Sequence, residues 1–215
     1  MLNRHAAVLA IVLLAAVPQA AFAKVWGCHG TKPGHPTTEE RSAFIREASE
    51  LALAAEKAHG VPASALAALA IAESGYGWTR VAINANNLFA WKYVPAAAEG
   101  RKSYLPACHL RRGINNHFVV FKSRADAFEF VSSRLATLDA YRPYTEAYKE
   151  ARKRGDAVDL AVNAWLTGIA NKYSHKPEVF RKKLVRVMNN PAEPADKLSP
   201  ELNLYHLSAK TRGGR

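Results

Sequence analysis

Acidic residues are scarce in this sequence. Its 215 residues include 18 aspartates and glutamates against 30 lysines and arginines, which gives a formal net charge of +12 at pH 7. Such a surface attracts polyanions, which could be nucleic acid, anionic lipid headgroups or an anionic cell-wall polymer. Hydrophobic residues make up 49% of the chain. This content excludes a disordered protein and suffices for one domain of ordinary size with its own core.

The sequence has no apolar run long enough to span a bilayer comfortably. The run Ala6–Val17 has 12 residues, follows the basic Arg4, and precedes Ala21-Phe22-Ala23, which places small residues at the −3 and −1 positions of a cleavage site. This pattern predicts a secretory signal peptide over residues 1–23, with an uncleaved anchor as the alternative. We therefore expect an exported protein, periplasmic or extracellular, with no membrane span in the mature chain and no nucleic-acid partner.

Cysteine is almost absent, and only Cys28 and Cys108 occur. Together with the nearby His29 and His35 they fit no standard zinc spacing, so we expect no metal and no cofactor. In an oxidising compartment a single pair most simply forms one disulfide, and two free thiols are the alternative. The bridge would close a loop of about 80 residues and stabilise the fold by about 4–5 kcal/mol in the chain-entropy view.

Helical periodicity dominates the rest of the chain. Thr37 and Glu40 form a capping box. The second predicted helix begins near Ser64, which is expected to be its N-cap, ends at Glu73, and is almost wholly apolar. The predicted helices span residues 37–60, 64–73, 123–138, 145–154, 156–166 and 177–188. Arg142-Pro143-Tyr144 reads as a break between two of them.

One strand signal, residues 117–121, is expected to pair with residues 103–105 as a small hairpin. The sequence therefore predicts a mainly α fold with a small β-hairpin lobe. We divide it into a signal peptide (1–23), an extended arm (24–36), a helical domain (37–190) and a basic flexible tail (191–215).

Glu73 is the most informative acidic residue. It closes an apolar helix and precedes a glycine-rich turn, residues 74–77, and a loop of aromatic and amide side chains. The negative end of the helix dipole and apolar surroundings both favour the protonated form of a carboxyl group. A carboxylic acid kept protonated near neutral pH is what glycosidic bond cleavage requires. The alternative is a capping or ion-paired glutamate on a surface turn.

Several segments carry a resemblance to a known family. They are Ala58-His59-Gly60-Val61-Pro62-Ala63-Ser64, Ala72-Glu73-Ser74-Gly75-Tyr76-Gly77, Asn86-Asn87-Leu88-Phe89-Ala90-Trp91-Lys92, Phe121-Lys122-Ser123, Arg142-Pro143-Tyr144 and Ala170-Asn171-Lys172-Tyr173-Ser174. Over roughly residues 40–188 the chain resembles the glucosaminidase-type peptidoglycan hydrolases of glycoside hydrolase family 73, which include flagellar-rod cell-wall hydrolases and Bax-type envelope proteins. Lysozyme-like and lytic transglycosylase domains share the Glu-Ser-Gly element, but their usual Gly-Leu-Met-Gln motif is absent here.

The resemblance implies a lysozyme-like helical domain with the β lobe beside a cleft, and peptidoglycan as the substrate. It makes Glu73 the general acid and places Tyr173 in the cleft near the reacting sugar. The residues expected to line the cleft are Tyr76, Trp78, Asn87, Phe89 and Trp91. Aromatic rings stack on sugar faces, and an amide both donates to and accepts from an N-acetyl group. For Phe89 and Trp91, core packing is the alternative.

A second acid, which family members often carry in the β lobe, is missing from its expected place. Between Trp91 and Phe121 the only acidic residue is Glu99, which becomes the candidate base. Without a second acid, the substrate's own N-acetyl group could attack the anomeric carbon. The resemblance implies cleavage of the β-1,4 bond after N-acetylglucosamine in peptidoglycan. The alternatives are a muramidase or lytic transglycosylase using Glu73, and a non-catalytic cell-wall-binding accessory protein.

Overall fold

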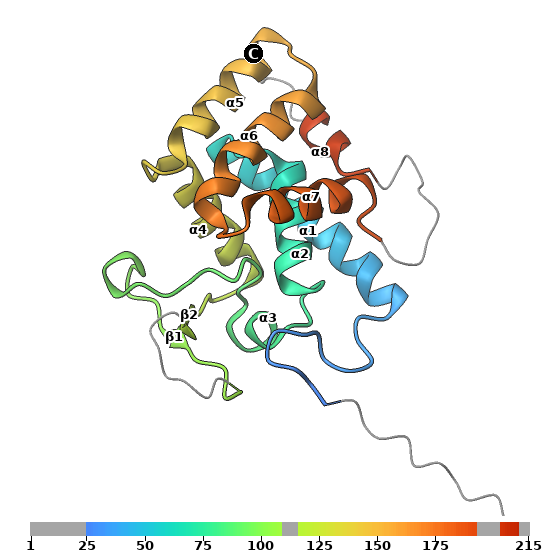
Figure 1. Cartoon of the computed structure of the whole chain (residues 1–215), viewed down its shortest axis with the longest axis vertical. Coiled ribbons are helices and arrows are strands. Elements are labelled where there is room, and N and C mark those ends of the chain that lie inside the picture. The colour runs from blue at the N-terminus through green and yellow to red at the C-terminus, as the bar shows by residue number, and fades with distance from the viewer. Residues whose placement is uncertain (1–24, 109–115, 193–202, 211–215) are drawn as a thin grey trace, which may run out of the picture.

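The computed structural model describes residues 25–108, 116–192 and 203–210, so the predicted signal peptide lies outside the described residues. Within them the protein is mainly helical with one two-stranded sheet, which confirms the predicted fold class. Helix α2 (Ala63–Ser74) lies at the centre and the sheet at one end (Figure 1). The helices that pack on α2 are α1 (Thr38–His59), α6 (Val158–Tyr173), α7 (Pro177–Asn189) and α8 (Tyr205–Lys210). The remaining helices are α3 (Arg80–Ala85), α4 (Arg124–Thr137), α5 (Arg142–Arg154) and the short 3-10 helix η1 (Pro95–Ala97).

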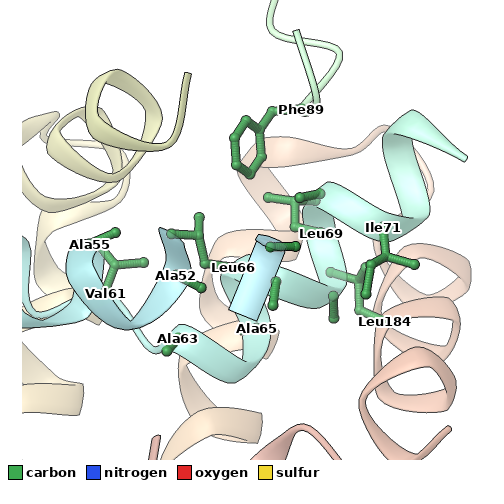
Figure 2. Packing of buried hydrophobic residues seen from close by; sticks show 14 of the residues in the cluster. Ala52, Ala55, Val61, Ala63, Ala65, Leu66, Leu69, Ile71, Phe89 and Leu184 are labelled. Carbon is green, nitrogen blue, oxygen red and sulfur yellow. The ribbon is translucent and has the colours of Figure 1, made fainter. Parts of the chain in front are cut away.

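Helix α2 is buried along its length because its sequence is apolar on every side. All residues from Ala63 to Ile71 are buried, and Leu66 and Leu69 have no exposed surface. Figure 2 shows these side chains packed between the alanines of α1 and Leu184 of α7. A helix without a polar face is stable only inside the domain. Its last turn therefore projects Glu73 from a closely packed support.

The helix boundaries follow local signals in most places. The Thr37–Glu40 capping box begins α1, Gly60 ends it with a positive φ of 72°, and Pro177 occupies the first turn of α7. The predicted break at Arg142-Pro143-Tyr144 is wrong: α5 begins at Arg142, and Pro143 lies in its first turn, where a missing N–H costs nothing. Ser64 is not the N-cap of α2 either, because Pro62 holds that position.

The small lobe consists of β1 (Ser103–Tyr104) and β2 (Phe118–Val119), which run antiparallel. Ser103 pairs with Val119 and Tyr104 with Phe118, so the predicted hairpin pairing is confirmed. An isolated bridge between Lys92 and Phe118 attaches the loop that follows α3 to the lobe. The lobe is thereby held beside the segment that follows Glu73.

The N-terminal arm lies along the turn after α2. Thr31 bridges Thr79, and the Lys32 N–H donates to the Trp78 carbonyl at 2.9 Å. A disulfide joins Cys28 to Cys108, with the two Cα atoms 5.4 Å apart, which confirms the expected pairing. The arm is therefore fastened both to the turn and to the lobe. No helix of the described residues has the length and apolar character needed to cross a membrane.

The prediction of a flexible tail from Pro191 onward is wrong for residues 203–210. Helix α8 (Tyr205–Lys210) lies within them, its Leu207 and Ser208 are buried, and Leu204 just before it is also buried. The Leu204 N–H donates to the Met188 carbonyl at 2.8 Å, and Arg152 donates to the Ser208 carbonyl at 2.9 Å. The segment is polar in overall composition, but two spaced leucines are enough to anchor one helical turn in the core.

Candidate active site

Glu73 lies in the last turn of α2, immediately before a turn with an unusual backbone. Three consecutive residues have positive φ angles: Gly75 (56°), Tyr76 (59°) and Gly77 (83°). An aromatic residue in the left-handed region is uncommon and costs about 1–3 kcal/mol, so the surrounding structure must hold it there. A side chain at Gly77 would meet the Phe44 ring at 3.0 Å, which explains why this position needs glycine. The chain thus reverses sharply at the carboxylate.

The Glu73 carboxylate has a cationic partner that the sequence does not reveal. The side chain of Glu73 is 25% exposed, and Nζ of Lys183 lies 3.3 Å from its Oε1. The same Nζ donates to the Ala72 carbonyl at 2.8 Å. Lys183 comes from α7, which packs against α2. Glu73 is therefore both accessible to solvent and ion-paired. The ion pair is what the alternative interpretation, a capping or ion-paired glutamate on a surface turn, predicts.

An aromatic cluster lies next to Glu73. Its members are Trp91, Tyr141, Tyr173 and Phe180. The Tyr173 ring stacks on Phe180 with centroids 5.3 Å apart and meets Trp91 at 6.1 Å and Tyr141 at 6.5 Å. Burial raises the pKa of the Tyr173 phenol well above its ordinary value, and the nearby charge of Glu73 raises it further. The Tyr173 hydroxyl consequently stays protonated, and it donates to the Phe89 carbonyl at 2.7 Å.

Tyr76 and Trp78 are partly buried on the other side of the turn. The Tyr76 hydroxyl donates to the Pro191 carbonyl at 2.5 Å. The Trp78 ring stacks on His35 of the N-terminal arm, with centroids 3.9 Å apart and planes 15° apart. Each ring therefore has a partner within the protein, and the N-terminal arm covers one face of Trp78.

Two of the predicted cleft residues do not line an open surface. Phe89 has no exposed area, and Figure 2 shows it in the core that contains Leu69. Asn87 is 1% exposed, and its amide donates to the Trp91 and Val119 carbonyls and accepts from the Phe89 and Trp91 N–H groups. Neither side chain is open to a ligand in this structure: Phe89 fills the core, and Asn87 organises the loop backbone.

Glu99 lies in the lobe and makes no contact with Glu73. Its carboxylate is exposed and pairs with Arg101 at 3.0 Å and with Arg134 of α4. Its backbone φ is positive, at 51°. Glu99 is therefore an ion-paired residue of the lobe. Its role as a base remains a prediction, and it has no contact with the proposed acid, Glu73.

A separate cavity of about 390 Å³ lies between α5 and α6. Its walls include Tyr144, Trp165 and the ion pair between Arg154 and Asp156. None of the site residues predicted from the sequence lines it. Among the described residues, no cluster of three or more metal-binding side chains occurs at this cavity or elsewhere. An accessible acid and an aromatic cluster coincide at Glu73 instead.

Sequence reasoning missed Lys183 and Tyr141. Lys183 lies 110 residues after Glu73 in a run of basic residues that gives no signal of a site. Tyr141 directly precedes the Arg142-Pro143-Tyr144 motif, so the quoted motif starts one residue after a member of the aromatic cluster. Spatial neighbours of this kind become visible only once α2, α6 and α7 are packed together.

Comparisons with known proteins bear on the family and the fold of the chain. The family model "Glucosaminidase: Mannosyl-glycoprotein endo-beta-N-acetylglucosaminidase" matches residues 49–192, a range that includes Glu73, Lys183 and the aromatic cluster. No curated protein matches the chain. Among solved structures, the catalytic domain of the autolysin Auto from Listeria monocytogenes is similar, with a TM-score of 0.50 and 17% identity over 82% of this chain and 90% of that one. That likeness supports the fold, and the family model extends over more than half of the sequence. The chain therefore belongs to the glucosaminidase family of glycoside hydrolases, the glucosaminidase-type peptidoglycan hydrolases that its motifs resemble.

Proposed function

We propose that the protein is an exported enzyme that cleaves the β-1,4 bond after N-acetylglucosamine in peptidoglycan, with Glu73 as the general acid. The observation that carries this proposal is the placement of Glu73. It is a partly exposed carboxyl group at the end of a rigid buried helix, beside an aromatic cluster that offers stacking surfaces for sugars. The family model supports the same reaction class.

In the proposed reaction, protonated Glu73 gives its proton to the glycosidic oxygen as the bond to the anomeric carbon breaks. The acetamide oxygen of the N-acetylglucosamine attacks that carbon and forms a cyclic oxazolinium ion. Water then opens the ring, and the Glu73 carboxylate accepts a proton from this water, which restores the acid. We favour this route over a base role for Glu99 because Arg101 and Arg134 already bind the Glu99 carboxylate.

Tyr173 supports the reaction by shaping the cluster. Its hydroxyl is bound to the Phe89 carbonyl, so its ring is held at a defined angle beside Trp91. Since burial raises its pKa well above the ordinary value, the hydroxyl stays protonated and remains a hydrogen-bond donor when the substrate binds. Of the predicted cleft residues, Trp91 is the one that keeps partial exposure within this cluster.

The proposed location rests on three features. The first 23 residues have the pattern of a signal peptide, the disulfide between Cys28 and Cys108 suits an oxidising compartment, and a net charge of +12 favours contact with an anionic polymer. Peptidoglycan carries carboxylates on its stem peptides. Electrostatic attraction would raise the encounter rate, and added salt would reduce it.

The proposal is tested by digestion of purified cell wall with the wild-type protein, Glu73→Gln and a control, Glu146→Gln. Glu146 is an exposed glutamate of α5 that pairs with Lys149. We expect the wild type and the control to clear the wall and Glu73→Gln to lose at least about a hundredfold in rate. Equal clearing by all three proteins would exclude Glu73 as the acid.

Analysis of the products distinguishes the alternatives. A new reducing-end N-acetylglucosamine supports the proposed specificity. An anhydro-muramic end indicates a lytic transglycosylase, and a reducing-end muramic acid indicates a muramidase. Binding to the wall without any product from the wild-type protein would favour a non-catalytic accessory protein.

A further inference from the structure

We propose that Lys183 is a specificity-determining residue of this site, which binds a carboxylate of the peptidoglycan stem peptide when Glu73 is protonated. The inference rests on the proposed function, because it assigns a substrate group to the site built around Glu73. It begins from the contacts of one ammonium group. Nζ of Lys183 bridges Oε1 of Glu73, at 3.3 Å, and the carbonyl of Ala72, at 2.8 Å.

Lys183 lies on a basic helix, α7, whose acidic residue Glu178 pairs with other cations. Glu178 pairs with Arg181 at 2.9 Å and lies 3.7 Å from Lys182. Glu73 is the acidic partner of Lys183 in the described part of the chain. Whether the positive charge of Lys183 is compensated therefore depends on the protonation state of the residue that has to act as an acid.

The reaction leaves the positive charge of Lys183 without its acidic partner. A general acid must carry its proton before it can donate it, and a protonated Glu73 no longer compensates the ammonium of Lys183. The Ala72 carbonyl remains as a neutral acceptor, and an ammonium has three donors. An anionic group of the bound substrate would compensate the charge of the Lys183 ammonium again.

The position of Lys183 allows such a group to reach it. Its side chain is 42% exposed, more than the 25% of Glu73, so the ammonium meets solvent beside the acid. A glycan strand bound across Glu73 would carry its stem-peptide carboxylates past the same surface. A neutral polymer of N-acetylglucosamine offers no such group, which makes Lys183 a discriminator between the two kinds of glycan.

The test measures binding, so that it remains informative even where turnover is slow. Titration calorimetry would compare the wild type, Glu73→Gln, Lys183→Met and the double variant. The ligands are soluble peptidoglycan fragments and the same fragments with their carboxylates amidated. Lys182→Met is the matched control, since Lys182 is the neighbouring lysine on α7 and contacts Glu178.

Glutamine imitates the protonated acid, so we expect Glu73→Gln to bind the carboxylate fragments about fivefold more tightly than the wild type. Lys183→Met should remove this gain in the double variant with Glu73→Gln, and Lys182→Met combined with Glu73→Gln should keep it. With amidated fragments the four proteins should bind alike. Equal losses on both ligands, or no gain in Glu73→Gln, would overturn the proposal.

A failure of the proposed function would look different. In that case none of the proteins would release glycan products, while the binding pattern could still identify Lys183 as a carboxylate site. If the wild type releases products and the variants bind both ligands equally, the enzyme assignment stands and the role of Lys183 is refuted.

Discussion

Tyr148 donates a 2.6 Å hydrogen bond to Oε1 of Glu56, and both side chains are buried. The other carboxylate oxygen accepts from the Ala63 N–H at 2.7 Å and from the Ser208 hydroxyl at 3.0 Å. This buried glutamate therefore joins α1 to the start of α2, to α5 and to α8. A buried carboxylate is tolerated only when its oxygens are satisfied, so each donor is needed.

Tyr148→Phe removes one of these donors and leaves the rest of the ring in place. We expect the free energy of unfolding to fall by about 1–3 kcal/mol, because one oxygen of Glu56 loses its partner in the interior. Chemical denaturation monitored by circular dichroism measures the loss. Tyr93→Phe is the control, since the Tyr93 hydroxyl makes no hydrogen bond within the described residues. An equal loss in both variants would mean that the bond to Glu56 adds nothing.

Removal of the disulfide should weaken the fold and loosen the arm. Replacement of Cys28 and Cys108 by serine opens a loop with a sequence separation of 80 residues. Chain-entropy reasoning gives a loss of about 4–5 kcal/mol at most. Thermal unfolding with and without reductant checks this: reductant should lower the Tm of the wild type and leave the serine variant unchanged. A wild type insensitive to reductant after full reduction would contradict the prediction.

The pH dependence of stability should change when Glu40 is replaced. The hydrogen bond from His35 and then that from the Thr37 N–H hold the pKa of Glu40 below its ordinary value of 4.5. A carboxyl group whose pKa is lowered by folding stabilises the protein above that ordinary value, and the contribution is lost as the pH falls through the folded pKa. Glu40→Gln should therefore be less stable than the wild type at pH 7, and the difference should shrink as the pH falls below 4.5 and through the lowered pKa of the folded state.

Denaturation midpoints across this pH range measure the effect. Glu39→Gln serves as the control, because Glu39 is also in the first turn of α1 but is exposed and makes no ion pair among the described residues. A difference for Glu40→Gln that stays constant down to pH 3 would rule out the ionised carboxylate as its source.

Tyr173→Phe tests the aromatic cluster without removing a ring. The variant loses the 2.7 Å bond to the Phe89 carbonyl, so the ring beside Trp91 is less firmly oriented. We expect a loss of about tenfold to a hundredfold in the rate of wall digestion, with little change in Tm. Tyr205→Phe is the control, because it loses a similar 2.7 Å bond, to Asn163, in another part of the domain. Equal rates for the two variants would remove Tyr173 from the site.

Local features were predictable from the sequence. Apart from the disulfide, for which only two cysteines were available, contacts between side chains far apart in the sequence were not. Thr37 and Glu40 are three residues apart, and their capping box forms as predicted because helix geometry alone brings them together. Ser64 looked like a cap for the same reason. Its hydroxyl instead lies 3.0 Å from that of Ser208, which is 144 residues away. No local pattern contains that information.

The candidate site divides in the same way. Glu73 could be located from the apolar helix before it and the glycines after it, which are consecutive in the sequence. The surroundings of Asn87 were not predictable, because an amide can serve a ligand or the backbone equally well, and only the folded loop shows that four backbone groups use it. Lys183 was missed because its partner lies on another helix.

Helix α8 also determines how the catalytic unit can be isolated. A fragment cut at the family limits, residues 49 and 192, would divide α1 near its middle and discard Leu204, Leu207 and Ser208. The Glu56 carboxylate would lose one of its donors, and the apolar surface beneath α8 would face water. Such a fragment should aggregate when expressed, while one that extends from Val25 to Lys210 keeps every described contact. The unit that folds is therefore longer than the unit that defines the family.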